Sequence, residues 1–168
     1  MSKVLYLDFD GVLQHESVYT HPKRGIYIKE PGFSLFQWMP ILDRLLEPHP
    51  EVAIVLSTSW VHSKSFNFAK ARLSESLQRR VIGATFHKVY MQKEQFLLMS
   101  RGAQIASDVE RRKPSFWFAI DDDEVGWPVW CRNNLIHTQG NLGLSEVNVQ
   151  LEIKNRLANS DLISADYK

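Results

Sequence analysis

The sequence predicts an α/β domain built on a parallel sheet that is wound by helices on both faces. Short apolar runs alternate with stretches of helical periodicity, which is the pattern of a doubly wound sheet. Three of the apolar runs end abruptly in acidic or hydroxyl-bearing residues. Ligands of such sheets bind beyond the carboxyl ends of the strands, so these polar residues are candidates for one shared site.

Five apolar runs are expected to form the strands, because short continuous apolar stretches are typical of strands buried on both faces. These runs cover residues 3–7, 52–56, 80–82, 116–120 and 135–137. Apolar residues at helical spacing predict helices over residues 34–46, 66–77, 102–112 and 145–157. Pro40 places the regular start of the first helix near residue 40, and Ser145 is the expected N-cap of the last.

The composition fits one globular domain, with 44% hydrophobic and 23% charged residues among 168. Residues 1–158 are expected to form this domain and residues 159–168 a C-terminal tail. The net charge of +1 does not indicate a protein built around a polyanion, although a local basic patch remains compatible with it. The single Cys131 excludes an internal disulfide, and no signal peptide or membrane-spanning run is present in the sequence. A cytoplasmic location is therefore expected.

The first strand is followed at once by two carboxylates and a glycine. Asp8 and Asp10 flank a phenylalanine, and Gly11 permits a tight turn that lets both acids face one point. Carboxylates at the end of a buried strand are costly unless a cation or hydrogen bonds compensate them. This pair therefore predicts a divalent metal site.

Two further strand ends carry groups of the same kind. Ser57, Thr58 and Ser59 follow the second strand, where hydroxyl and backbone N–H groups can hold phosphate oxygens. Four consecutive acids follow the strand at 116–120, namely Asp121, Asp122, Asp123 and Glu124. Asp123 is expected to be a surface residue. Acids that bind Mg²⁺ beside hydroxyls that bind phosphate predict one metal and phosphate site.

The motifs DFDGVL, LSTSW, an arginine at the head of a helix, and AIDDD occur in this order. They resemble the four signature motifs of the haloacid dehalogenase (HAD) superfamily of phosphohydrolases, over roughly residues 3–138. More narrowly, RVIGATF, the R-x-x-Q-I of residues 101–105 and LSTSW resemble the compact HAD domains of Swiss Army Knife RNA repair proteins. The resemblance implies a HAD-like Rossmannoid fold, a phosphatase activity and Mg²⁺ as the cofactor.

The resemblance also implies a role for each motif residue. Asp8 would be the nucleophile that forms an aspartyl phosphate, and Asp10 would be the general acid and base. Ser57, Thr58 and Arg101 would bind the phosphoryl group, and Arg101 would supply the cation near the nucleophile. Lysine fills this position more often in the superfamily, and Lys93 or Lys113 are alternatives to Arg101.

The implied metal set consists of Asp8, the backbone carbonyl of Asp10, Asp121 and Asp122. Residues 14–32 are long enough only for a loop or a small flap, and residues 86–100 cannot hold a cap domain. The site is therefore expected to lack a large cap and to be open, which suits a large substrate such as a nucleic-acid end or a phosphoprotein. The resemblance to RNA repair proteins points to a phosphorylated substrate among RNA or DNA ends and nucleotides. Trp60 is expected to be a buried aromatic residue, or alternatively a platform for a base.

Three other functions remain open on the sequence alone. A phosphatase for small metabolites would need a lid from a partner chain. A non-catalytic module would keep the metal site without turnover. A signalling receiver domain also gathers acids around Mg²⁺, but its acceptor aspartate normally follows the third strand, whereas Asp8 follows the first.

Overall fold

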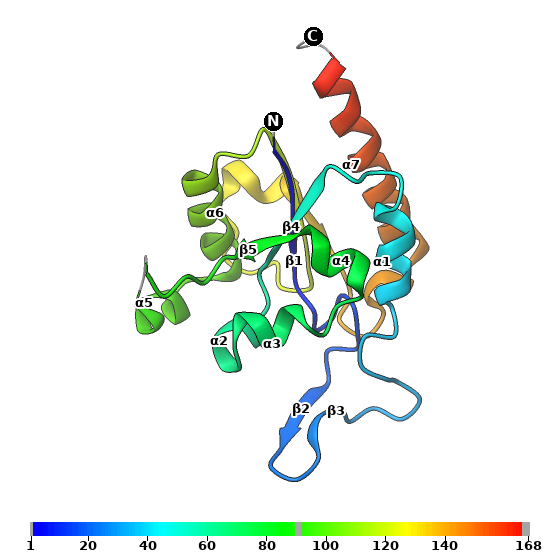
Figure 1. Ribbon diagram of the computed structural model, residues 1–168, viewed down its shortest axis with the longest axis vertical. Helices are drawn as coiled ribbons and strands as arrows, with labels where there is room; N and C mark the ends of the chain where they lie inside the picture. The colour runs from blue at the N-terminus through cyan, green and yellow to red at the C-terminus, as the bar shows by residue number, and fades with distance from the viewer. Residues whose placement is uncertain (1, 90–91, 166–168) are drawn as a thin grey trace.

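The central element is a five-stranded parallel sheet with the strand order β5-β4-β1-β6-β7, seen in the computed structural model in Figure 1. The structure describes residues 2–89 and 92–165, with side chains up to residue 160. The strands are β1 Lys3–Leu7, β4 Val52–Leu56, β5 Val81–Ala84, β6 Phe116–Asp121 and β7 Leu135–His137. All five expected strands are confirmed, and the fold is the predicted Rossmann-like α/β arrangement.

Helices cover both faces of this sheet. They are α1 Met39–Leu46, α2 Trp60–Ser63, α3 Phe66–Lys70, α4 Glu75–Arg80, α5 Lys93–Leu98, α6 Arg101–Arg112 and α7 Val147–Ala165. Two 3₁₀ helices, η1 Val129–Asn134 and η2 Gly143–Ser145, flank β7. A separate antiparallel hairpin, β2 Val18–His21 with β3 Gly25–Ile28, projects from the body at the bottom of Figure 1.

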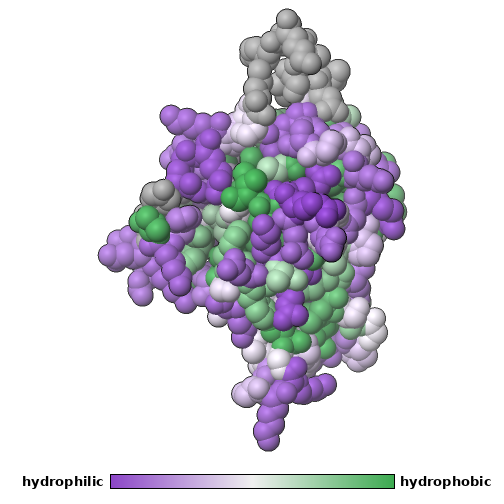
Figure 2. Space-filling view, viewed as in Figure 1, coloured by the Kyte–Doolittle hydropathy of each residue, from purple (hydrophilic) through white to green (hydrophobic). Residues whose placement is uncertain are grey.

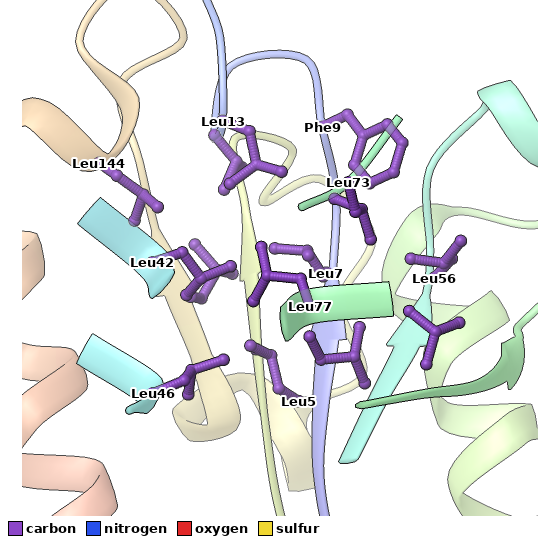
Figure 3. Close-up of a cluster of buried hydrophobic side chains, with 14 of the residues drawn as sticks. Leu5, Leu7, Phe9, Leu13, Leu42, Leu46, Leu56, Leu73, Leu77 and Leu144 are labelled. Atoms are coloured by element: carbon purple, nitrogen blue, oxygen red, sulfur yellow. The ribbon is translucent and has the colours of Figure 1, made fainter. Parts of the chain in front are cut away.

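The period-two alternation along β1 divides the apolar core into two layers. Leu5 and Leu7 face the larger layer, which packs against α1, α4 and α7 and is drawn in Figure 3. Val4 and Tyr6 face the smaller layer, which includes apolar residues of α6 and η1. Because both faces of β1 are buried, the strand is fixed in register and its carboxyl end is held rigidly.

Several element boundaries differ from expectation. The helix expected over residues 66–77 is two helices, because the Ser74 side chain accepts a hydrogen bond from the backbone N–H of Leu77 and starts α4 anew. The Ser145 N-cap prediction is wrong: Ser145 lies in η2, and its hydroxyl donates to the carbonyl of Leu142. Helix α7 continues to Ala165, past its expected end at residue 157. The short α2 and α5 were not expected.

The segment that follows the DFDGVL motif contains no large insertion. The β2–β3 hairpin occupies most of the segment in which a loop or small flap was expected. Figure 2 shows that the tip of this hairpin, at the bottom of the view, is hydrophilic. Among the described residues, no helix is both long and apolar enough to cross a membrane.

Candidate active site

The three strand ends that the sequence singled out lie next to one another. Strand β1 lies between β4 and β6, and all three run parallel. Asp8 follows β1, Ser57 follows β4, and Asp121 is the last residue of β6. Parallel strands end at the same edge of a sheet, so the topology alone brings these side chains together.

Three carboxylates form a cluster at this edge. One carboxylate oxygen from each of Asp8, Asp121 and Asp122 lies within 4.8 Å of the others. Asp8 and Asp121 are buried, and Asp122 is partly exposed. Gly11 makes this packing possible: its φ is +73°, and a Cβ there would overlap the carboxylate of Asp122. The glycine is therefore required by the position of Asp122 as well as by the turn.

The cluster is electrostatically unfavourable as it stands. Burial, and to a smaller degree the neighbouring charge of Asp8, raises the pKa of Asp121 well above its ordinary value. Burial likewise raises the pKa of Asp8, while Arg101 opposes this change. Burial and Asp8 raise the pKa of Asp122 to about 7. Carboxyl groups whose pKa is raised in this way are typical of functional sites, and a bound cation would relieve the repulsion between their charges.

Arg101 is the cation that contacts this cluster. Its Nη2 lies 3.5 Å from Asp8 Oδ2, and its Nε lies 3.3 Å from Asp121 Oδ2. Ser100 caps α6, which places Arg101 at the first position of the helix. Lys93 instead donates to the backbone carbonyl of His62. Lys113 lies past the opposite end of the 12-residue α6, roughly 18 Å from Arg101 along the axis.

Asp10 is held apart from the cluster by two side-chain donors. Its Oδ1 accepts a hydrogen bond of 2.7 Å from Gln14 Nε2, and Trp60 Nε1 lies 3.1 Å from both carboxylate oxygens. Burial, and next the charge of Asp8, raises the pKa of Asp10 to about 6. The expectation of a buried Trp60 fits its exposed fraction of 4%; its indole binds Asp10 and offers no open face to a base.

Two buried oxygens lack a hydrogen-bond partner among the described residues, Ser57 Oγ and Asp121 Oδ2. Most buried polar atoms in proteins are hydrogen-bonded, so such atoms call for a ligand. Three clustered carboxylates, with Asp121 Oδ2 ion-paired to Arg101 Nε but not hydrogen-bonded, fit a hard divalent cation such as Mg²⁺, which prefers oxygen ligands. The spare hydroxyl of Ser57 fits a phosphoryl oxygen. Thr58 differs, because its side chain already hydrogen-bonds Asp8.

Sequence reasoning missed three residues that support the site. Gln14 is fully buried and joins Asp10 to the backbone N–H of Phe36, which lies 2.9 Å from Gln14 Oε1. Thr138 is buried and donates to the carbonyl of Gly11 at 2.7 Å, which fixes the turn after Asp10. The charge of Glu16 adds to the rise in the pKa of Asp122, after burial and Asp8. Only Thr138 carried a sequence signal, because it directly follows an expected strand.

The acids at the end of β6 differ in their exposure to solvent. Asp121 is fully buried, Asp122 is partly exposed, and Asp123 is exposed, as expected. The Oδ1 of Asp121 accepts a 3.0 Å hydrogen bond from the backbone N–H of Asp123, which orients the Asp121 carboxylate. Trp127 is buried in the loop that follows and donates to the carbonyl of Asp123.

A Rossmann-like sheet that gathers carboxylates, a hydroxyl and an arginine at one edge is an arrangement suited to binding a metal ion and a phosphoryl group. Residues 4–149 match the family described as "HAD domain in Swiss Army Knife RNA repair proteins". This match covers most of the chain, and the chain belongs to this HAD family. The family suggests a phosphohydrolase. No curated protein and no solved structure matches the chain.

Proposed function

We propose that the protein is a Mg²⁺-dependent phosphomonoesterase that acts through an aspartyl phosphate on Asp8. The observation that carries this proposal is the cluster of Asp8, Asp121 and Asp122, in which one oxygen of each carboxylate lies within 4.8 Å of the others, beside Arg101. A structural ion pair would not need three crowded carboxylates at the end of a buried sheet. Its substrates are phosphorylated ends of RNA or DNA, or nucleotides.

In the first step a carboxylate oxygen of Asp8 attacks phosphorus, and the bond from phosphorus to the ester oxygen breaks. Asp10 gives its proton to the leaving oxygen. Water then attacks the aspartyl phosphate while Asp10 accepts its proton, which releases inorganic phosphate and restores the Asp8 carboxylate. The hydrogen bond from the backbone N–H of Phe9 to Asp8 Oδ1, 2.8 Å long, fixes the orientation of the nucleophile.

The remaining residues hold charge in place. Arg101 offsets the negative charge that the phosphoryl group brings to Asp8, and the hydroxyl of Ser57 donates to a phosphoryl oxygen. Asp8, Asp121, Asp122 and the backbone carbonyl of Asp10 would hold Mg²⁺. When bound, the metal neutralises charge so that an anionic carboxylate can approach an anionic phosphate.

The test is phosphate release from an aryl phosphate, a mononucleotide and oligonucleotides phosphorylated at either end. We expect Mg²⁺-dependent turnover in the wild type and a loss of at least about 1,000-fold in Asp8→Asn, which keeps the shape of the side chain. Asp123→Asn is the matched control, because it removes an exposed carboxylate beside the cluster. A phosphate adduct on the Asp8 peptide after acid quenching is also expected.

Near-normal turnover in folded Asp8→Asn would refute the aspartyl-phosphate mechanism. Absence of turnover with every substrate in the panel, despite Mg²⁺ binding, would leave the protein as a metal-binding module. Asp121→Ala is expected to weaken Mg²⁺ binding, and excess metal should restore part of its activity. Equal Mg²⁺ affinity in the wild type and Asp121→Ala would move the metal site away from Asp121.

A further inference from the structure

A pocket of about 730 Å³ lies on the β5 side of the sheet. Three segments form it: residues 61–67 of α2 and α3, residues 82–88 at and after the end of β5, and the last turn of α6. In Figure 1 the chain leaving β5 passes between α6 above and α2 below, on the left of the molecule. None of the roles assigned to the catalytic site uses this pocket.

The pocket is strongly basic. Five cationic side chains line it together with two histidines, and no acidic side chain lines it among the described residues: Lys64, Lys88, Lys93, Arg111, Arg112, His62 and His87. The two arginines share one buried acid, Asp108. When Asp108 and Glu94, which lines an adjoining hollow with Lys88 and Lys93, are counted against the five cations, three positive charges remain, against +1 for the whole protein. Positive charge is therefore concentrated here, where it attracts an anion.

The pocket and the phosphate-binding segment are continuous along the chain. His62 lines the pocket only four residues after Thr58. The carboxyl end of β5, which lines the pocket, lies at the same sheet edge as Asp8, and Lys93 of the pocket donates to the carbonyl of His62 at 2.9 Å. The end of the pocket formed by α2 and the end of β5 therefore lies near the catalytic cluster, while Arg111 and Arg112 line its far end, at the opposite end of α6 from Arg101.

The spacing of the strands gives the distance between the end of β5, which lines the pocket, and Asp8. Strand β5 lies two positions from β1, and neighbouring strands are about 4.8 Å apart, so the end of β5 is displaced by about 10 Å from Asp8. Phosphates of a stacked strand follow one another at about 3.4 Å along its axis. A displacement of about 10 Å therefore corresponds to about three nucleotides. Phe66, partly exposed in the pocket wall, adds an aromatic surface on which a base can stack.

We propose that this basic pocket binds the backbone phosphates of a single-stranded nucleic acid whose terminal phosphate lies at Asp8. This inference rests on the proposed phosphatase function and specifies its substrate as an oligonucleotide of about four nucleotides or more. The charge would attract any polyanion, but regularly spaced phosphates beside a site for a terminal phosphate favour a nucleic-acid strand over an acidic protein.

The binding experiment uses Asp8→Asn, so that turnover does not enter the measurement. A labelled, 5′-phosphorylated tetranucleotide is titrated with the protein and followed by fluorescence anisotropy at several salt concentrations. We expect Lys64→Glu and Lys88→Glu, each made in this background, to weaken binding by at least about 5-fold and to lower the salt slope by about one. The matched control is Lys154→Glu, at an exposed position of α7, the helix on the opposite side of the molecule in Figure 1, and it should have little effect.

A second readout separates this proposal from the phosphatase itself. In the otherwise wild-type enzyme, Lys64→Glu and Lys88→Glu should lower kcat/KM for the tetranucleotide but leave kcat/KM for an aryl phosphate within about 2-fold. Tetranucleotide binding without turnover of any substrate would overturn the phosphatase and support the pocket. The pocket proposal fails if the tetranucleotide binds no more tightly than a mononucleotide, if Lys154→Glu weakens binding equally, or if an acidic peptide of equal charge binds as well.

Discussion

Replacing Asp122 by asparagine should stabilise the metal-free protein while it weakens the metal site. The side chain keeps nearly the same shape, so its close approach to Gly11 is preserved. What changes is one negative charge beside the buried Asp8. Because this charge is unfavourable in the absence of a cation, its removal should raise the free energy of unfolding.

The size of the effect follows from the pKa of Asp122, which burial first and Asp8 second raise from 3.8 to about 7. The unfolded chain restores the ordinary value, so ionisation favours unfolding once the pH exceeds about 4, and the full cost is reached above about pH 7. The whole displacement corresponds to about 4 kcal/mol. Because Asp122 is partly exposed, solvent screening reduces this, and we expect about 1–2 kcal/mol, or a rise in Tm of about 2–8 °C.

The assay is thermal unfolding with a metal chelator at pH 8 and pH 5, and again with saturating Mg²⁺ at pH 8. The gain in Tm should be largest at pH 8 without metal and less than half as large at pH 5. Mg²⁺ should stabilise the wild type more than the variant, because the carboxylate then binds the cation. Asp123→Asn, at an exposed position, should change Tm little. No gain at pH 8, or an equal gain at both pH values, would refute the electrostatic argument.

Three further outcomes are expected. Tyr6→Phe should lower the free energy of unfolding by about 1–2 kcal/mol in urea titration, because the buried Tyr6 hydroxyl donates a 2.9 Å hydrogen bond to buried Asp108; an unchanged midpoint would contradict this. Gly11→Ala should destabilise by about 1–2 kcal/mol and abolish phosphate release, because of its positive φ and the overlap with Asp122; normal kinetics would show that the loop adapts. Arg101→Lys should keep more activity than Arg101→Met, since charge beside the nucleophile matters most; equal kcat/KM values would argue for a purely geometric role.

The sheet and the meeting of its strand ends could be predicted because both depend on local pattern. Continuous apolar runs mark strands buried on both faces, and the parallel topology brings their carboxyl ends to one edge. The break between α3 and α4 was missed because apolar spacing continues across it, while the capping side chain of Ser74 decides the boundary.

The residues that hydrogen-bond Asp10 could not be predicted from the sequence. Gln14 is a polar residue in a loop by sequence, and only the folded structure shows it buried between Asp10 and the backbone of Phe36. Trp60 carried an apolar pattern that indicated burial, but the partner of its indole N–H depends on a residue 50 positions away. Contacts of this kind leave no local pattern, because they are set by packing between distant segments.

The direction of the strands has a practical consequence for attaching the protein to a surface through either end of its chain. Strand β1 begins at Lys3 and runs toward the active-site edge, so its amino end lies at the opposite edge of the sheet. Figure 1 shows the far end of α7 on that same side, at the top, with the β2–β3 hairpin at the bottom. A linker joined at either end of the chain therefore leads away from Asp8. Protein tethered to a sensor surface by either end would present its catalytic edge to the solution, where strands and metal ions have free access.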